Sequence, residues 1–298
     1  MQIGIIGLGN MGSGMAANLQ AFSASQNQSL WVFDLDAEKV ATQTARGAQA
    51  ADSVEELVGK VDVLLTSLPS AVQVNAIAPV VFEHGSQGLT WLETSTNDLG
   101  QWQKILDAAP AHMTLIDAPI TGGYEGARDG TLTMLMGADE AQVAPLRPML
   151  DAMTKKALVM GPSGAGYITK LAQLHLNYLV AQGIGEALML GAKGGLDLAQ
   201  LHDVFMNSCA QSYVVDAYIP RVLDGSYDPS FALGLARKDM RLVNDLGAHL
   251  GVDLELGQQV LSAYDDATDR YGFDAPHLSI LKRIEEASGQ TLRTPSDS

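Results

Sequence analysis

The first half of the chain alternates short apolar runs with amphipathic segments. The apolar runs predict strands near residues 3–7, 30–34, 61–68, 89–93, 114–120 and 131–136. Periodic segments that begin near residues 11, 37, 53, 71, 99 and 139 predict the helices between them. The early strands are almost continuously apolar, as parallel strands are when helices cover both faces of a sheet. This alternation predicts a doubly wound, mostly parallel α/β sheet.

The pattern changes at residues 161–166, Gly-Pro-Ser-Gly-Ala-Gly, and only helical periodicity follows as far as Gly289. The stretch 167–193 contains no proline and predicts one helix of roughly seven turns. We therefore expect two domains, an α/β domain over residues 1–162 and an all-α domain over residues 163–298. The polar residues 288–298 predict a loose tail.

Composition and charge narrow the possible partners. The 298 residues include 34 acidic and 18 basic side chains, which gives a net charge of −16. Such a charge repels phosphate backbones and anionic lipids, so we expect neither a nucleic-acid nor a membrane partner. One cysteine, Cys209, and six histidines without metal-binding spacing predict no intrachain disulfide and no metal site. The N-terminal residues lack the features of a signal peptide, so a cytoplasmic location is expected.

A glycine-rich loop follows the first predicted strand and opens the first predicted helix. It consists of Gly7, Leu8, Gly9, Asn10, Met11 and Gly12. In a dinucleotide-binding loop of this form, the first glycine permits a tight turn, the second lets the pyrophosphate approach the backbone, and the third lets helix and strand pack closely. The helix N-terminus supplies N–H groups and the positive end of its dipole to the phosphates. The alternative is an ordinary glycine turn, but the strand and the helix around it favour dinucleotide binding.

An acidic residue, Asp34, ends the second predicted strand and follows Gly12 by 22 residues. A carboxylate at this distance accepts hydrogen bonds from the adenosine ribose hydroxyls and repels a 2′-phosphate. Leu35 and Asp36 come next, where an NADP enzyme more often has arginine or lysine. The sequence therefore predicts NAD as the cofactor, although a solvated aspartate at a strand end is the alternative.

Four separated stretches resemble one family of enzymes. They are GLGNMGSGMAANL at residues 7–19, DAPITGGYEGARDGTLTMLMG at 117–137, GAGYITK at 164–170 and FALGLARKD at 231–239. Together they are similar to the β-hydroxyacid dehydrogenases, the family of 3-hydroxyisobutyrate dehydrogenase and tartronate semialdehyde reductase. The resemblance implies a Rossmann domain, a long helix, an all-α domain, and an active site in the cleft between the domains.

The resemblance also implies roles for individual residues. GAGYITK is similar to the family's catalytic motif, which makes Lys170 the expected catalytic residue. The residues expected beside the cofactor, besides the glycine loop and Asp34, are Leu68, Pro69, Thr96 and Lys238. The residues expected to bind the substrate carboxylate are Thr121, Gly122 and Gly123.

A lysine suits the expected chemistry. When a hydride leaves the carbinol carbon of a hydroxyacid, the hydroxyl group must lose a proton, which a neutral lysine amine can accept. In the reverse direction the ammonium group returns that proton. From position alone Lys170 could equally be a surface lysine, and the match to GAGYITK favours the catalytic role.

The chain departs from the family pattern at one position near this lysine. The family commonly has asparagine four residues after the lysine, where this chain has Leu174. Residues three and seven positions after Lys170 share the same helix face, so Gln173 and Asn177 could supply the amide groups instead. The departure leaves the cofactor assignment unchanged and makes the substrate harder to name.

These observations predict an oxidoreductase that transfers a hydride between NAD and a small anionic β-hydroxyacid, similar to 3-hydroxyisobutyrate, or its semialdehyde. One alternative is an imine reductase, which shares the architecture but usually replaces the lysine. Another is a non-catalytic NAD-binding regulatory protein on the same scaffold. Because the all-α half must cover a long, largely apolar helix, we expect self-association, and the resemblance to the family implies a homodimer or homotetramer.

Overall fold

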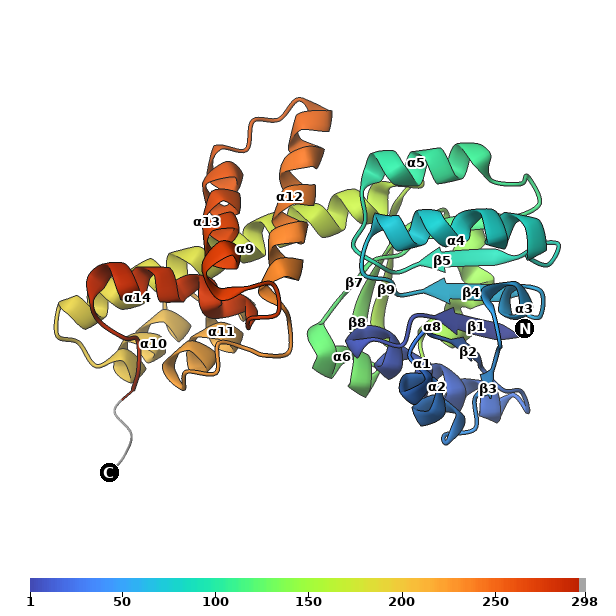
Figure 1. Cartoon of the computed structure of the whole chain (residues 1–298), viewed down its shortest axis with the longest axis horizontal. Coiled ribbons are helices and arrows are strands. Elements are labelled where there is room, and N and C mark those ends of the chain that lie inside the picture. Colours follow the sequence, from blue (N-terminus) through green and yellow to red (C-terminus); the bar gives the residue numbers. More distant parts are fainter. Residues whose placement is uncertain (295–298) are drawn as a thin grey trace. The chain divides into compact units, whose positions relative to one another are not determined.

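The computed structural model describes residues 1–294, which form two compact units that divide between Lys170 and Leu171. The long helix α9 (Ala165–Lys193) begins in the first unit and continues into the second (Figure 1). The predicted helix over residues 167–193 is thus confirmed, with two further residues at its start. Among residues 1–294, no helix combines the length and the apolar character that a membrane crossing requires.

The first unit contains one mixed sheet with the strand order β3-β2-β1-β4-β5-β6-β8-β7, and β9 pairs with β8. The parallel strands are β1 (Ile3–Ile6), β2 (Trp31–Phe33), β3 (Gln49–Ala50), β4 (Val63–Thr66), β5 (Thr90–Glu93) and β6 (Thr114–Asp117). The remaining strands are β7 (Ile120–Thr121), β8 (Leu132–Gly137) and β9 (Thr154–Gly161), of which β8 runs antiparallel to β6 and β7. The strand order reverses between β1 and β4, and such a switch point is where doubly wound sheets bind ligands.

Helices cover both faces of this sheet, and each face has its own apolar core. The helices are α1 (Asn10–Ser25), α2 (Ala37–Thr44), α3 (Val54–Val58), α4 (Ala71–His84), α5 (Leu99–Ala108), α6 (Gly123–Asp129), α7 (Glu140–Val143) and α8 (Arg147–Leu150). Figure 1 shows α4 and α5 along one face and α1 and α2 along the other. One core joins Met15 of α1 to Ile5, and the other joins Trp102 of α5 to Leu64 and Trp91. The predicted doubly wound α/β sheet is therefore confirmed.

Two strands of the first unit differ from the sequence prediction. The single strand expected over residues 114–120 is split into β6 and β7, because Pro119 lacks an N–H and interrupts the ladder. β9 was not predicted, because its alternating pattern includes the exposed Lys155 and Lys156. Most of its residues, Lys156 among them, pair with β8, so the sheet extends further than apolar runs alone indicate.

The second unit is helical throughout its described residues. Besides the larger part of α9 it contains α10 (Leu198–Met206), α11 (Tyr213–Leu223), α12 (Leu233–Leu250), α13 (Glu255–Tyr271) and α14 (Lys282–Ser288), with a 3₁₀ helix at His277–Leu281. Tyr178 of α9 packs edge-to-face on Tyr264 of α13, with ring centroids 5.4 Å apart. The predicted all-α half is therefore confirmed.

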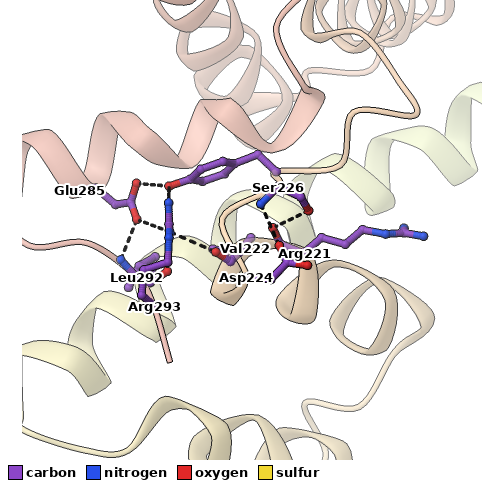
Figure 2. Close-up of polar contacts among 8 residues, drawn as sticks. Arg221, Val222, Asp224, Ser226, Glu285, Leu292 and Arg293 are labelled. Carbon is purple, nitrogen blue, oxygen red and sulfur yellow. Dashed lines mark hydrogen bonds and ion pairs between the residues drawn. The ribbon is translucent and has the colours of Figure 1, made fainter. Parts of the chain in front are cut away.

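The segment after α14 is anchored, so the expected loose tail is wrong for residues 289–294. The Leu292 side chain is fully buried, and its N–H donates to a Glu285 carboxylate oxygen at 2.6 Å. Arg293 donates to the Val222 carbonyl at 3.1 Å and to Glu285 at 3.2 Å (Figure 2). The Tyr227 hydroxyl accepts from Arg293 and donates to Glu285. Residues 295–298 lie outside the described part of the chain.

The anchor predicts a pH-dependent loss of stability. Burial and the bond to Glu285 raise the pKa of Tyr227 to about 12. Because this folded-state pKa exceeds the unfolded value of about 10, the stabilisation is complete below about pH 10 and fades as the pH rises towards 12. We expect Tyr227→Phe to lower the free energy of unfolding by about 1–3 kcal/mol at neutral pH. Urea unfolding of wild type and variant measures this difference.

The exposed Tyr213 provides the control, since Tyr213→Phe should leave the free energy of unfolding unchanged. The difference between wild type and Tyr227→Phe should shrink at about pH 11. A difference that stays constant from neutral to alkaline pH would contradict the role given to the Tyr227 hydroxyl.

Candidate functional site

The glycine loop lies at the carboxyl end of β1, beside the point where the strand order reverses. Gly7 has φ +93°, a conformation that L side chains rarely adopt, and a Cβ there would overlap the carbonyl oxygen of Ser67. A Cβ on Gly12 would overlap the carbonyl oxygen of Gly7. Both glycines are therefore required by the close approach of the protein's own backbone.

Gly9 differs from these two glycines. A Cβ on Gly9 would meet no atom of the described residues within 4 Å. Gly9 is also the N-cap of α1, and no described side chain caps this helix or places an acid in its first turn. The positive end of α1 therefore faces open space, and this fits a pyrophosphate lying against the backbone.

Asp34 is held beside this loop. One of its carboxylate oxygens accepts from the Leu8 N–H at 2.6 Å, and the other accepts from the Asp36 N–H at 2.9 Å. The Gly7 N–H in turn donates to the Phe33 carbonyl at 3.0 Å. The carboxylate is therefore fixed at the edge of the glycine loop, where ribose hydroxyls would need an acceptor.

The loops that follow β4 and β5 adjoin the same end of the sheet. The Ser67 N–H donates to the Ile6 carbonyl at 2.9 Å, which places the β4 loop beside the glycine loop. The Leu68 N–H donates to the Ser95 hydroxyl at 2.8 Å. The segments containing Leu68, Pro69 and Thr96 are thus brought together with the glycine loop and Asp34.

The candidate carboxylate loop joins β7 to α6. Thr121 ends β7, and Gly122 and Gly123 follow with φ +131° and +69°. Residues other than glycine are strained in these conformations. With glycine at both positions, the loop has no side chain of its own there to cover its backbone N–H groups. The short helix α6, which starts at Gly123, was not predicted from the sequence.

Lys170 lies in the second turn of α9 and is 8% exposed. The start of this helix is fixed by Asp117, at the end of β6. The Asp117 carboxylate accepts from the N–H groups of Gly164 at 2.7 Å and Tyr167 at 3.1 Å, and burial raises its pKa. A Cβ on Gly166 would overlap the Leu135 carbonyl oxygen, so the helix begins directly against the sheet.

The remaining candidates belong to the second unit. The Asn177 amide oxygen accepts from the Tyr218 hydroxyl at 3.3 Å, and Gln173 is half-buried one turn earlier. Leu174 is buried. Lys238, in α12, lies 3.1 Å from a carboxylate oxygen of Asp239.

Within residues 1–294, no group of three or more histidine, cysteine, aspartate or glutamate side chains is arranged to hold a metal ion. Glu93, a fully buried carboxyl group at the end of β5, was not predicted from the sequence. An acidic residue at the end of an apolar strand is its one signal in the sequence, and a solvated acid gives the same signal.

The fold and the glycine loop define an NAD(P)-binding Rossmann domain followed by a helical domain. Residues 2–161 match the family described as the NAD binding domain of 6-phosphogluconate dehydrogenase. Residues 164–284 match the family described as NAD-binding of NADP-dependent 3-hydroxyisobutyrate dehydrogenase.

Individual relatives agree with these matches. The chain is 31% identical to 2-(hydroxymethyl)glutarate dehydrogenase of Eubacterium barkeri, over 98% of this chain and 97% of the relative. It is 31% identical to NAD-dependent L-serine dehydrogenase of Pseudomonas aeruginosa, over 88% and 91%. The solved structure of Mycobacterium tuberculosis 3-hydroxyisobutyrate dehydrogenase with L-serine has a TM-score of 0.86 and 26% identity, over 95% of this chain and 99% of that one.

The chain belongs to the β-hydroxyacid dehydrogenase family, whose members are oxidoreductases acting on CH–OH groups.

The contrast between Gly9 and Gly12 can be tested by substitution. Gly9→Ala should fold with unchanged or slightly higher stability, because the methyl group meets only open space and alanine restricts the unfolded chain. Its affinity for NADH should fall by at least about tenfold, because the methyl group would lie where we expect the pyrophosphate to approach. Fluorescence titration with NADH and urea unfolding measure the two effects.

Gly12→Ala is the matched control, since it should lose stability first and NADH affinity only as a consequence. A Gly9→Ala variant that binds NADH as tightly as the wild type would show that the pyrophosphate does not lie there.

Proposed function

We propose that this protein is an NAD-dependent dehydrogenase that oxidises the primary alcohol of a small 3-hydroxy acid, or reduces the corresponding semialdehyde. The observation that carries the proposal is the burial of Lys170 on a helix whose first turn is fixed to the carboxyl end of the cofactor-binding sheet. The printed names of the relatives support the substrate class. L-serine, 3-hydroxyisobutyrate and 2-(hydroxymethyl)glutarate all contain a CH₂OH group on the carbon that bears a carboxylate.

Bound NAD would supply the hydride acceptor, and the chain would supply the proton acceptor and the binding groups. The neutral amine of Lys170 takes the proton of the substrate hydroxyl, and the ammonium returns it in the reductive direction. Thr121 and the backbone N–H groups of Gly122 and Gly123 hold the substrate carboxylate. A group that accepts a proton, together with donors aimed at an anion, is what a hydroxyacid dehydrogenase requires.

Two amides of α9 complete the proposed substrate site. Gln173 and Asn177 follow Lys170 by three and seven residues and share its helix face. Tyr218 donates to the Asn177 amide oxygen, which orients the Asn177 amide N–H groups for donation to the substrate. Leu174, four residues after Lys170, is buried and offers the substrate no polar group.

The cofactor contacts that we propose are those of the first unit together with one lysine of the second. Asp34 accepts from the ribose hydroxyls and repels a 2′-phosphate, and Asp36 adds further negative charge. The loop residues Leu68, Pro69 and Thr96 lie along the cofactor, and Lys238 contributes from α12. Apolar side chains exposed on α9, Leu176 and Leu190, support self-association as a dimer or tetramer, which light scattering at micromolar concentration can test.

The first prediction for this function concerns Lys170. Lys170→Met should keep the fold and NADH binding while kcat for the best hydroxyacid falls by roughly two to four orders of magnitude. Lys170→Arg should not restore activity, because a guanidinium group stays protonated and cannot accept the proton. Steady-state assays against a panel of 3-hydroxy acids with NAD measure these effects.

Lys193→Met, at the exposed end of the same helix, is the matched control and should leave kcat unchanged. A Lys170→Met variant within a few-fold of wild-type kcat would assign proton transfer to another group. Binding of NADH without turnover of any hydroxyacid would favour a regulatory protein.

The second prediction concerns cofactor choice. The wild type should have at least about tenfold higher kcat/KM with NAD than with NADP, because the Asp34 carboxylate pairs with hydroxyls and repels a phosphate. Asp34→Ala should reduce this ratio, because it weakens the binding of NAD and removes the repulsion of the NADP 2′-phosphate. Equal kcat/KM values for both cofactors in the wild type would refute the preference.

A further inference from the structure

A buried tyrosine–glutamate pair of the first unit has no part in the proposed chemistry. Tyr167 lies in the first turn of α9, and its hydroxyl donates to the carboxyl group of Glu93, at the end of β5. Both side chains are fully buried. Burial raises the pKa of the Glu93 carboxyl group, and it raises the pKa of the Tyr167 phenol well above the usual value for tyrosine. The charged form of each group is therefore disfavoured.

Aromatic packing fixes the orientation of this tyrosine. The Tyr167 ring packs edge-to-face on Trp102, with ring centroids 5.7 Å apart. Trp102 packs in the same way on Trp91, at 5.9 Å, and its indole N–H donates to the Ser163 hydroxyl at 3.1 Å. The hydroxyl of Tyr167 is therefore directed at Glu93 by rings that cannot rotate without opening the core.

Glu93 connects Tyr167 to the loops that adjoin the glycine loop. Its second carboxyl oxygen accepts from the Ser95 N–H at 3.0 Å, and the Thr66 hydroxyl lies 3.4 Å away. The Ser95 hydroxyl accepts from the Leu68 N–H at 2.8 Å. One buried carboxyl group thus joins the ends of β4 and β5 to the first turn of α9.

We propose that the Glu93–Tyr167 pair is a positioning element that holds Lys170 in register with the cofactor loops after β4 and β5. Lys170 follows Tyr167 by three residues, about 4.5 Å along the helix axis, so a shift of this turn displaces the lysine directly. A displacement of about 1 Å can cost two orders of magnitude in rate. The inference rests on the proposed role of Lys170, and neither member of the pair needs to touch the substrate.

The first test removes one hydroxyl group. Tyr167→Phe keeps the ring and its packing on Trp102 but breaks the bond to Glu93. We expect kcat to fall by about tenfold to a hundredfold, with the NADH dissociation constant within about threefold of wild type because the cofactor loops stay joined. The isotope effect with substrate deuterated at the carbinol carbon should rise, because a misplaced lysine makes the chemical step limiting.

Tyr227→Phe is the matched control, because it also removes a buried tyrosine–glutamate bond, in the second unit. It should lose stability while kcat stays at the wild-type level. A kcat for Tyr167→Phe within about twofold of wild type would overturn the proposal, and so would an equal loss of kcat in Tyr227→Phe.

The second test changes the acceptor. In Glu93→Gln the amide oxygen can accept from Ser95 while the NH₂ group donates to the Tyr167 hydroxyl, so most of kcat should remain. Glu93→Asp withdraws the carboxyl group by one methylene and should lose kcat as Tyr167→Phe does. If Tyr167→Phe does not fold, these two variants decide the matter, and wild-type kcat in Glu93→Asp would overturn the proposal.

The two proposals fail in different ways. If Lys170→Met retains activity, Lys170 is not the proton-transfer residue, whatever the result for Tyr167→Phe. If Lys170→Met is inactive and Tyr167→Phe behaves as wild type in kcat and isotope effect, only the positioning role is wrong.

Discussion

The hydrogen bonds between the buried Asp117 carboxylate and the start of α9 are the interaction on which the rest of the site depends. Two N–H groups at the start of a helix need acceptors, and here a side chain at the end of β6 provides both. Burying a carboxylate is costly, and the helix N-terminus compensates with hydrogen bonds and a favourable dipole. The small residues around it follow from this contact, because a Cβ on Gly137 or on Gly166 would overlap the Asp117 carboxylate. The motif GAGYITK is therefore as much a packing requirement as a chemical one.

Much of the fold could be predicted from the sequence, because its signals are local. Continuous apolar runs indicate buried parallel strands, and the absence of proline indicates the long helix. The glycine loop and Asp34 are also readable, since their meaning depends on short spacings. β9 could not be predicted in this way, because half of its residues face solvent and it is held by pairing with β8 rather than by an apolar run of its own.

The contacts around Lys170 could not be predicted, because their partners are distant in sequence. Tyr167 lies 74 residues from Glu93 and 50 from Asp117. Neither acid has a recognisable spacing to the lysine, and a buried acid at a strand end looks the same in sequence as a solvated one. The same tyrosine–glutamate bond also occurs at Tyr227 and Glu285, where it anchors a terminal segment. Only the surrounding elements distinguish the two uses.

The open space beside Gly9 bears on which residues evolution would keep at this position. Its backbone, at φ −64° and ψ −168°, is open to alanine, and alanine would stabilise the fold by about 0.4–1 kcal/mol. Folding therefore selects against glycine at this position, whereas it selects for glycine at positions 7 and 12. A descendant of this chain that abandoned its dinucleotide would be expected to keep Gly7 and Gly12 and to lose Gly9. With the pyrophosphate at Gly9 as proposed, the identity of this one residue would record ligand binding separately from the fold.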